Sequence, residues 1–231
     1  MEDPLSSWRL FWLLALAISV IDLAGLRSAD LHTPRGIISI ILLTVRCALP
    51  LFVVAFTASS LVRLWPGRVT RWLLANRRYV GLAFAFGMAW HLVFVGYSFS
   101  TSGVHLNRTI ITLDLVGLAF LLALTMTSFR WAARHLSVRV WRRLHKTGVY
   151  VIWLLATYIY AESVRWGPDA VNVTALTILL AAWGVRVASM QASRQHRRGV
   201  LGSVHKAHDR PEHGRARHAD DKEARQGRLE G

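Results

Sequence analysis

Long apolar segments alternate with short polar stretches along the first 190 residues of the chain. A helix needs about 20 apolar residues to cross the hydrocarbon core of a bilayer. Six segments meet this requirement, and they cover residues 8–26, 37–62, 79–99, 109–129, 147–164 and 171–190. Breakers such as Gly167-Pro168 separate them. The pattern therefore predicts an all-α, polytopic membrane protein built as a bundle of six transmembrane helices.

Cations are unevenly distributed among the polar stretches. Residues 63–78 and 129–146 hold eleven Lys and Arg residues, whereas the other three connecting stretches hold four. The eleven are Arg63, Arg68, Arg71, Arg77, Arg78, Arg130, Arg134, Arg139, Arg142, Arg143 and Lys146, and the four are Arg27, Arg35, Arg108 and Arg165. Because cation-rich loops stay on the cytoplasmic side, both termini are predicted to be cytoplasmic. We expect a multi-pass integral membrane protein, surrounded by lipid.

The end of the chain differs in composition from the apolar part. Residues 191–231 are rich in Arg, His, Gly, Ala and acids and nearly free of large apolar side chains, so they cannot build a core. We therefore predict two regions, a transmembrane domain over 1–190 and a basic, disordered cytoplasmic tail over 191–231. The net charge of +15 is explained by topology, and nucleic acid is not expected as a partner. The single Cys47 excludes an internal disulfide.

Ionisable groups inside the predicted spans are costly and become candidates for function. Arg46 lies about ten residues into the second span, where it needs a carboxylate partner, either a membrane aspartate or a haem propionate. His91 lies midway along the third span, and it is either a hydrogen-bonded packing residue or a metal ligand. Small residues around it allow close helix packing, but they also leave room for a flat macrocycle. Asp22 and Asp114 are expected to snorkel or to pair.

The stretch from Thr127 to Tyr160 places His145 between a basic loop and the fifth apolar segment. A histidine at this point indicates a cofactor held at the cytoplasmic surface. With a helical rise of about 1.5 Å per residue, Arg77 and Arg78 come level with His145, and His91 comes level with Tyr158. The sequence thus predicts two tiers. His91 and His145 are about 16 Å apart in depth, so they cannot bind one iron together.

These residues resemble the ferric reductase-like transmembrane domain family, which includes NADPH oxidases and the haem-binding membrane subunit of the bacterial methionine-sulfoxide reductase system. The resemblance covers roughly residues 37–190. It is strongest in Asn76-Arg-Arg-Tyr with His91, in Thr127-Ser128, and in Trp141-Arg-Arg-Leu-His145. It implies a location in a bacterial inner membrane and b-type haems in two tiers, with His91 and His145 as iron ligands. The chain departs from the family at Tyr158, where relatives usually carry a second histidine. The lower-tier partner on the third span is Arg77 and not a histidine, as in the methionine-sulfoxide reductase subunit.

The expected function is that of a haem-b electron-transfer subunit, passing electrons from a cytoplasmic or quinol donor toward the outer face. The candidate cofactor-binding residues are His91, His145, Arg46, Arg77, Arg78 and Tyr158. One haem, two haems and no haem all remain open. The tail lacks a Gly-rich nucleotide-binding motif, so any oxidoreductase activity would depend on a separate donor protein or a quinol. The alternative is a non-redox membrane scaffold or assembly protein that keeps the fold.

Overall fold

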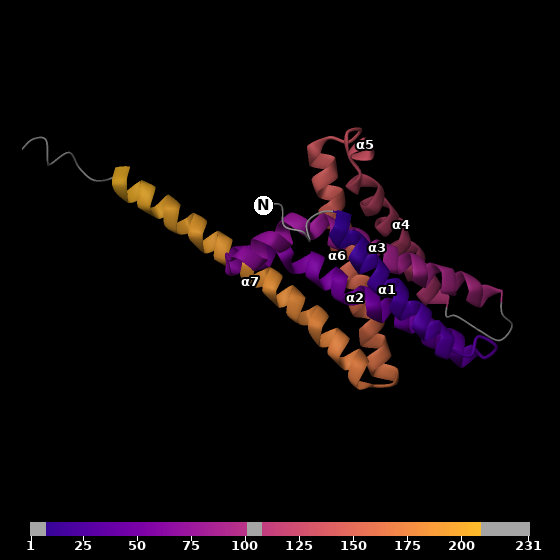
Figure 1. Ribbon diagram of the computed structural model, residues 1–231. Helices are drawn as coiled ribbons and strands as arrows, with labels where there is room; N and C mark the ends of the chain where they lie inside the picture. Colours follow the sequence, from indigo (N-terminus) through magenta and orange to yellow (C-terminus); the bar gives the residue numbers. More distant parts are fainter. Residues whose placement is uncertain (1–7, 101–107, 209–231) are drawn as a thin grey trace, which may run out of the picture. The chain divides into compact units, whose positions relative to one another are not determined.

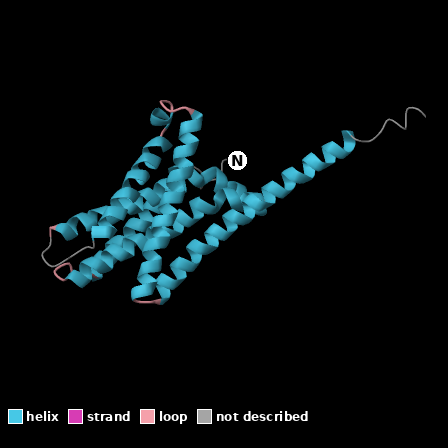
Figure 2. Ribbon diagram, turned by 180° about the vertical axis from the view of Figure 1, so that it is seen from behind, coloured by secondary structure: helices cyan, strands magenta, loops and turns pink. Residues whose placement is uncertain are grey.

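The computed structural model describes residues 8–100 and 108–208, and helices make up almost all of this part (Figures 1 and 2). The helices are α1 (Trp8–Ser28), α2 (Pro34–Leu64), α3 (Arg68–Phe99), α4 (Arg108–Ser128), α5 (Arg130–Ala133), α6 (Val138–Trp166) and α7 (Ala170–His208). Within these residues, every helix except α5 is long and apolar enough to cross a membrane. The predicted all-α fold with six membrane spans is confirmed.

The chain divides into two compact units, residues 1–187 and 188–231, with the boundary inside α7. The predicted division at residue 190 stays a prediction. Residues 191–208, which were expected to belong to the tail, continue α7 to His208. The rest of the predicted tail, 209–231, lies outside the described residues.

Two helices begin well before the apolar segments that predicted them. α3 begins at Arg68 rather than near residue 79, and α6 begins at Val138 rather than near residue 147. The Ser137 side chain caps α6 by accepting a hydrogen bond from the Val140 N–H at 3.3 Å. Hydropathy detects only the part of a helix that lies in lipid, whereas Arg and Trp continue a helix into the interface. The expectation that residues 68–78 and 138–146 are loops is therefore wrong.

The helices of the first unit pack in two groups, as Figure 1 shows. α1, α2 and α3 lie against one another, and Gly87 permits this because a Cβ there would come within 3.1 Å of Ala48. α4 packs along α6, where a Cβ on Gly148 would come within 3.1 Å of Leu124. Small residues allow membrane helices to approach this closely. The two groups meet where the backbones of α3 and α4 come close to each other.

Large aromatic side chains bridge the space between α2, α6 and the first part of α7. The rings of Phe56 and Trp153 stack at 6.3 Å between centroids, and Trp153 stacks on Trp183 at 4.7 Å. Arg186 donates to the Phe56 carbonyl oxygen at 2.9 Å. Its guanidinium also lies over the Phe56 and Tyr150 rings, at 4.4 and 4.8 Å. Side chains rather than close backbones hold these helices together, which leaves room for a cavity beside them.

Candidate cofactor-binding site

A cavity of about 770 Å³ lies between the two groups of helices. Its lining comes from the end of α2, the first half of α3, the end of α4 and the first half of α6, with Arg186 added from α7. The apolar part of the lining includes Phe52, Phe56, Phe84, Leu121, Val149 and Ile152. The volume falls within the range of roughly 300–1,000 Å³ that is usual for small-molecule and cofactor sites.

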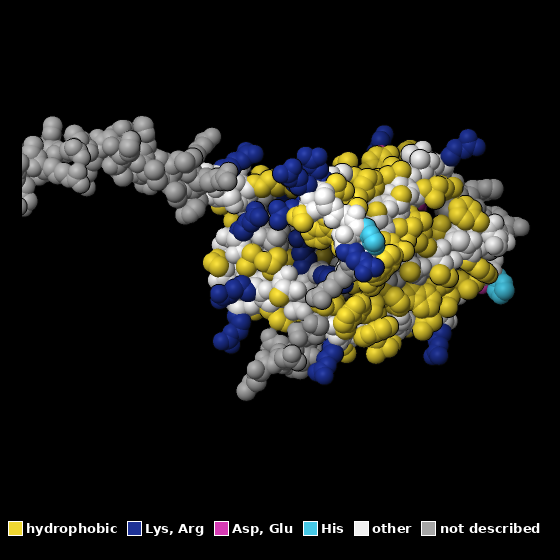
Figure 3. Space-filling model, turned by 90° about the horizontal axis from the view of Figure 1, so that it is seen from above, with side chains coloured by type: hydrophobic (Ala, Val, Ile, Leu, Met, Phe, Trp, Pro, Cys, Tyr) yellow, Lys and Arg dark blue, Asp and Glu magenta, His cyan; other side chains and the backbone are white. Residues whose placement is uncertain are grey.

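Cations line the cavity, and none of its lining residues is Asp or Glu. The cationic lining residues are Arg63, Arg77, Arg78, Arg142, Lys146 and Arg186. Figure 3 shows Lys and Arg side chains gathered on the face of the molecule seen from above. Neither of the two ion pairs that occur among the described residues includes Arg63, Arg77, Arg78, Arg142 or Lys146. The positive charge of these five residues is therefore not balanced by the ion pairs of the described residues.

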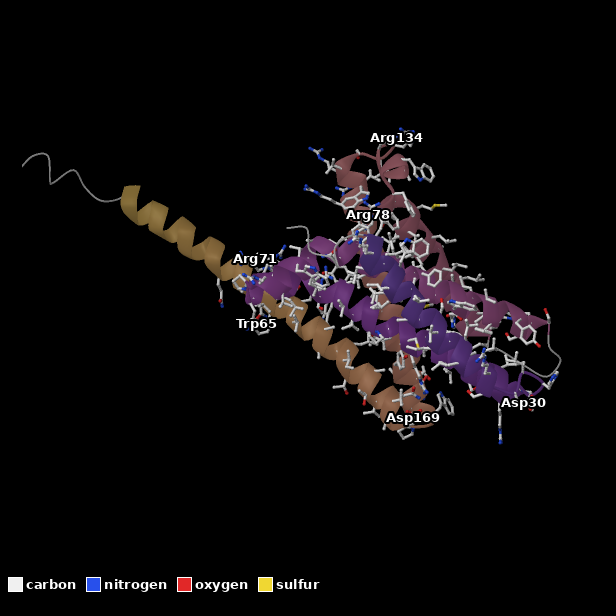
Figure 4. All side chains as sticks on the ribbon, in the orientation of Figure 1. Asp30, Trp65, Arg71, Arg78, Arg134 and Asp169 are labelled. Atoms are coloured by element: carbon white, nitrogen blue, oxygen red, sulfur yellow. The ribbon has the colours of Figure 1, made fainter. Side chains whose placement is uncertain are left out.

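One donor of this cavity is buried without an acceptor. The Arg78 Nε atom has no hydrogen-bond partner in the structure, and Arg78 lines the cavity from α3 (Figure 4). An unsatisfied buried donor costs about 1–3 kcal/mol, and more when it is charged. An anionic group inside the cavity would satisfy it.

His145 is the histidine of the cavity, and α6 places it one turn after Trp141. Its Nε2 atom lies 3.0 Å from the Thr127 hydroxyl oxygen at the end of α4. The Trp141 ring lies 4.3 Å from the imidazole, measured between centroids. The Trp141 indole N–H donates to the Thr127 carbonyl oxygen at 3.0 Å. The histidine is thus held in one place by both helices.

A haem fits these residues. Gly81 lines the cavity, and no atom lies within 4 Å of the position that a Cβ would take there, so a flat group has room beside α3. The aromatic and aliphatic lining suits a macrocycle, His145 supplies an imidazole, and the cations suit two propionates. The described residues contain no cluster of three or more His, Cys, Asp or Glu side chains that would hold a bare metal ion.

The structure brings together three of the six predicted cofactor-binding residues. His145, Arg77 and Arg78 line the same cavity, as the helical rise predicted. His91 does not line it. This imidazole is buried between α3 and α2, where Nδ1 lies 3.4 Å from both the Thr44 hydroxyl oxygen and the Ile41 carbonyl oxygen. Tyr158 also lies outside the cavity, with 45% of its surface exposed.

Arg46 on α2 forms an ion pair with Asp169, which follows the end of α6 that lies away from His145. Its guanidinium lies 3.4 Å from an Asp169 oxygen and 3.3 Å from the Asn172 side-chain oxygen. The other Asp169 oxygen accepts from the Val171 and Asn172 backbone N–H groups, at 2.6 and 2.9 Å. The Asn172 N–H above all, together with the Val171 N–H and the Arg46 charge, lowers the pKa of Asp169. The carboxylate beside Arg46 is therefore a protein side chain in the turn between α6 and α7 (Figure 4).

Asp22 is buried among the helices and does not snorkel. It was expected to snorkel or to pair, but its side chain is fully buried between α1 and α2 beside the Cys47 thiol. Neither carboxylate oxygen has a hydrogen-bond partner that meets ordinary geometry. Asp114 on α4 interacts electrostatically with His91. Helix depth alone cannot show toward which neighbour a side chain turns, so the sequence could not identify Cys47 and His91 as the neighbours of the two aspartates.

Sequence reasoning placed Trp141 in the motif that carries the family resemblance but assigned it no contact with His145, and it assigned no role to Arg186, although both residues line the cavity. A signal for Trp141 was available, because residues four apart on a helix lie on the same face and Trp141 precedes His145 by four. A signal for Arg186 was also available, because it is an ionisable residue inside the predicted sixth span, 171–190. It approaches the cavity only because α7 packs beside Phe56 and Tyr150.

Comparison with known proteins points to one kind of membrane subunit. Over 129 residues the chain is 36% identical to the protein-methionine-sulfoxide reductase heme-binding subunit MsrQ of Yersinia pseudotuberculosis serotype O:1b, and to the protein of the same name from Yersinia pestis strain Pestoides F. The match covers 53% of this chain, and 61% and 60% of these relatives. No family model and no solved structure matches the chain.

The relatives confirm the predicted resemblance to the haem-binding membrane subunit of the methionine-sulfoxide reductase system. Together with the six apolar helices, they also confirm the predicted location. The chain is an integral, multi-pass protein of the bacterial inner membrane.

Proposed function

We propose that the chain is a haem-b-binding subunit that carries electrons across the membrane. The observation that carries this proposal is the cavity in which His145 meets five cations that take part in neither described ion pair, namely Arg63, Arg77, Arg78, Arg142 and Lys146. Relatives named as heme-binding subunits support the same function. When bound, the haem supplies one-electron chemistry, and the chain supplies its binding, orientation and electrostatic environment.

Each part of the cavity has a separate role in this proposal. His145 would be the iron ligand. Arg78, with its unpartnered Nε, would bind a propionate, and Arg77 would act beside it as a second propionate clamp. The aromatic and aliphatic lining keeps water from the macrocycle. Charge-assisted hydrogen bonds to carboxylates are stronger than neutral ones, so the cations fix the orientation of the group.

The direction of electron flow and the partners are also part of the proposal. The cavity lies at the cation-rich end of the bundle, which the loop charges predict to be cytoplasmic. Electrons would enter there from a separate donor protein or from a quinol and leave at the outer face. The relatives are named as heme-binding subunits of a protein-methionine-sulfoxide reductase, which supports a reductase of that kind as the partner that accepts the electrons. The non-redox scaffold is the competing proposal.

A deeper haem tier is a second and separate proposal, with His91 as ligand and Tyr158 beside it. It rests on the resemblance described above, whereas the cavity accounts for one haem. In the structure the His91 ring contacts Thr44 and Ile41, so a deeper haem would need these helices to separate. The haem count per chain decides between one tier and two.

The test uses the protein purified after expression with ample haem. We expect a reducible Soret band, a b-type alpha band and about one haem per chain. His145→Ala should remove most of this absorbance, and His135→Ala, which changes an exposed histidine beyond α5, should retain it. If a second haem is present, His91→Ala should remove one of two. A colourless wild-type protein would support the scaffold instead.

A further inference from the structure

His145 is fixed in the cavity by a hydrogen bond with a side chain of the neighbouring helix α4. Its ring is held from α4 by the Thr127 hydroxyl, at 3.0 Å from Nε2. A hydroxyl has one proton to donate and lone pairs with which to accept. The direction of the hydrogen bond to His145 therefore depends on where the Thr127 proton lies.

The Thr127 proton is already used inside α4. The hydroxyl donates to the Ala123 carbonyl oxygen at 2.6 Å, and the Leu124 carbonyl oxygen lies farther away, at 3.4 Å. Toward His145 the hydroxyl oxygen consequently acts as an acceptor. A neutral imidazole carries one N–H, so the proton of His145 lies on Nε2 and the lone pair lies on Nδ1.

Trp141 contacts both Thr127 and His145 and fixes their positions relative to each other. Its indole N–H donates to the Thr127 carbonyl oxygen at 3.0 Å, which is one of the carbonyls left without a partner at a helix end. Its ring lies 4.3 Å from the His145 ring. The close approach of Gly148 to Leu124 sets the distance between the two helices. The imidazole therefore has little freedom to turn away from Thr127.

We propose that Thr127 is a positioning residue for the haem ligand, accepting the Nε2–H of His145 so that Nδ1 faces the iron. This inference rests on the proposed function. A hydrogen-bond acceptor on the distal nitrogen of a ligating histidine fixes its tautomer and makes the imidazole more basic. A more basic ligand stabilises ferric iron, so Thr127 holds the reduction potential of the haem low.

Three variants test the assignment in the haem-loaded protein. Thr127→Val has nearly the same shape but no hydroxyl, and Thr127→Ser restores the hydroxyl. Thr157→Val is the matched control, since the Thr157 hydroxyl donates within its own helix to the Trp153 carbonyl oxygen at 2.8 Å. We expect Thr127→Val to raise the midpoint potential and to weaken haem binding by about 10- to 100-fold, the usual effect of losing such a partner.

Thr127→Ser and Thr157→Val should retain the potential and affinity of the wild type. The inference is wrong if Thr127→Val leaves both quantities unchanged. It is also wrong if Thr157→Val changes them as much as Thr127→Val does.

A measurement on the haem-free protein separates this inference from the proposed function. In protein labelled with ¹⁵N-histidine, the resonances of His145, assigned by their loss in His145→Gln, should show a proton on Nε2 and none on Nδ1. Thr127→Val should shift them. A wild type that takes up no haem but shows this pattern contradicts the function and not the hydrogen bond. A wild type that binds haem with the proton on Nδ1 contradicts the inference alone.

Discussion

At the scale of single residues, Arg78 illustrates how a buried donor can indicate a ligand. Its Nε atom is buried without a partner, so Arg78→Leu removes both a charge and an unsatisfied group. We predict a fall in haem affinity of at least about tenfold, because a hydrogen bond to a charged group contributes about 1.5–3 kcal/mol. Titration of the haem-free protein with haemin, followed by absorbance, measures this change.

The matched control for Arg78 is Arg71, on the same helix. Its Nε donates to the Gly67 carbonyl oxygen at 3.2 Å, its side chain is exposed, and it does not line the cavity. Arg71→Leu should leave the haem affinity unchanged. Equal losses in the two variants would mean that general positive charge, and not the Arg78 contact, attracts the haem.

The ion pair of Arg46 with Asp169 gives a second prediction at this scale. Arg46→Leu and Asp169→Asn should each lower the melting temperature in detergent, and the double variant should lose no more than the larger single loss, because one interaction is removed. The pKa of Asp169 is lowered in the folded protein. Its contribution is therefore present at neutral pH and is lost as the pH falls through the folded-state pKa. Thermal unfolding at neutral and acidic pH measures both effects.

The haem content of Arg46→Leu distinguishes the ion pair with Asp169 from binding of a propionate. Arg46 lies outside the cavity, so Arg46→Leu should keep its haem as long as the protein folds. If the haem is lost while folded yield and melting temperature remain unchanged, Arg46 binds a propionate, which was the other alternative that the sequence left open.

The sequence predicted the positions of single residues correctly where only their depth along a helix was needed. The helical rise placed Arg77 and Arg78 level with His145, and the structure brings these residues to one cavity. The rotation of each helix about its axis is set by packing, which is not visible in one sequence. For that reason the burial of Asp22 beside Cys47 and the contacts of Thr127 appeared only in the structure.

At the scale of helices, the close contact between α4 and α6 is the feature that positions His145. A Cβ on Gly148 would lie 3.1 Å from Leu124 atoms, whereas nothing lies within 4 Å of that position at Gly96 on α3. Gly148→Leu should therefore force the helices apart at a cost of about 1–3 kcal/mol, and haem content should fall. Gly96→Leu is the control and should have little effect. Melting temperature and haem content of both variants, measured in detergent, check this prediction.

Hydropathy located all six spans but misplaced the beginnings of α3 and α6. The reason is physical, because the first turns of both helices lie where Arg side chains reach water while the helix continues. These turns are also where the cavity receives its cations. A sequence method that stops a helix at the last apolar residue therefore omits part of the site.

At the scale of the whole molecule, the distribution of charge predicts the orientation in the membrane. The stretches around Arg71 and Arg134 are cation-rich, while Asp30 and Asp169 lie in the turns at the other ends of their helices (Figure 4). Each Lys or Arg in a short loop opposes translocation of that loop. We therefore predict that the cavity and both termini face the cytoplasm.

Cysteine labelling in intact cells tests this orientation directly. The chain has one cysteine, so Cys47→Ala gives a background without thiols. Into it we would introduce Asp30→Cys or Arg134→Cys, both at exposed positions in short turns. A membrane-impermeant maleimide added to spheroplasts should label Asp30→Cys at once, but Arg134→Cys only after lysis. Labelling in the reverse order would invert the topology and place the cavity at the outer face, where an electron donor from the cytoplasm could not reach it.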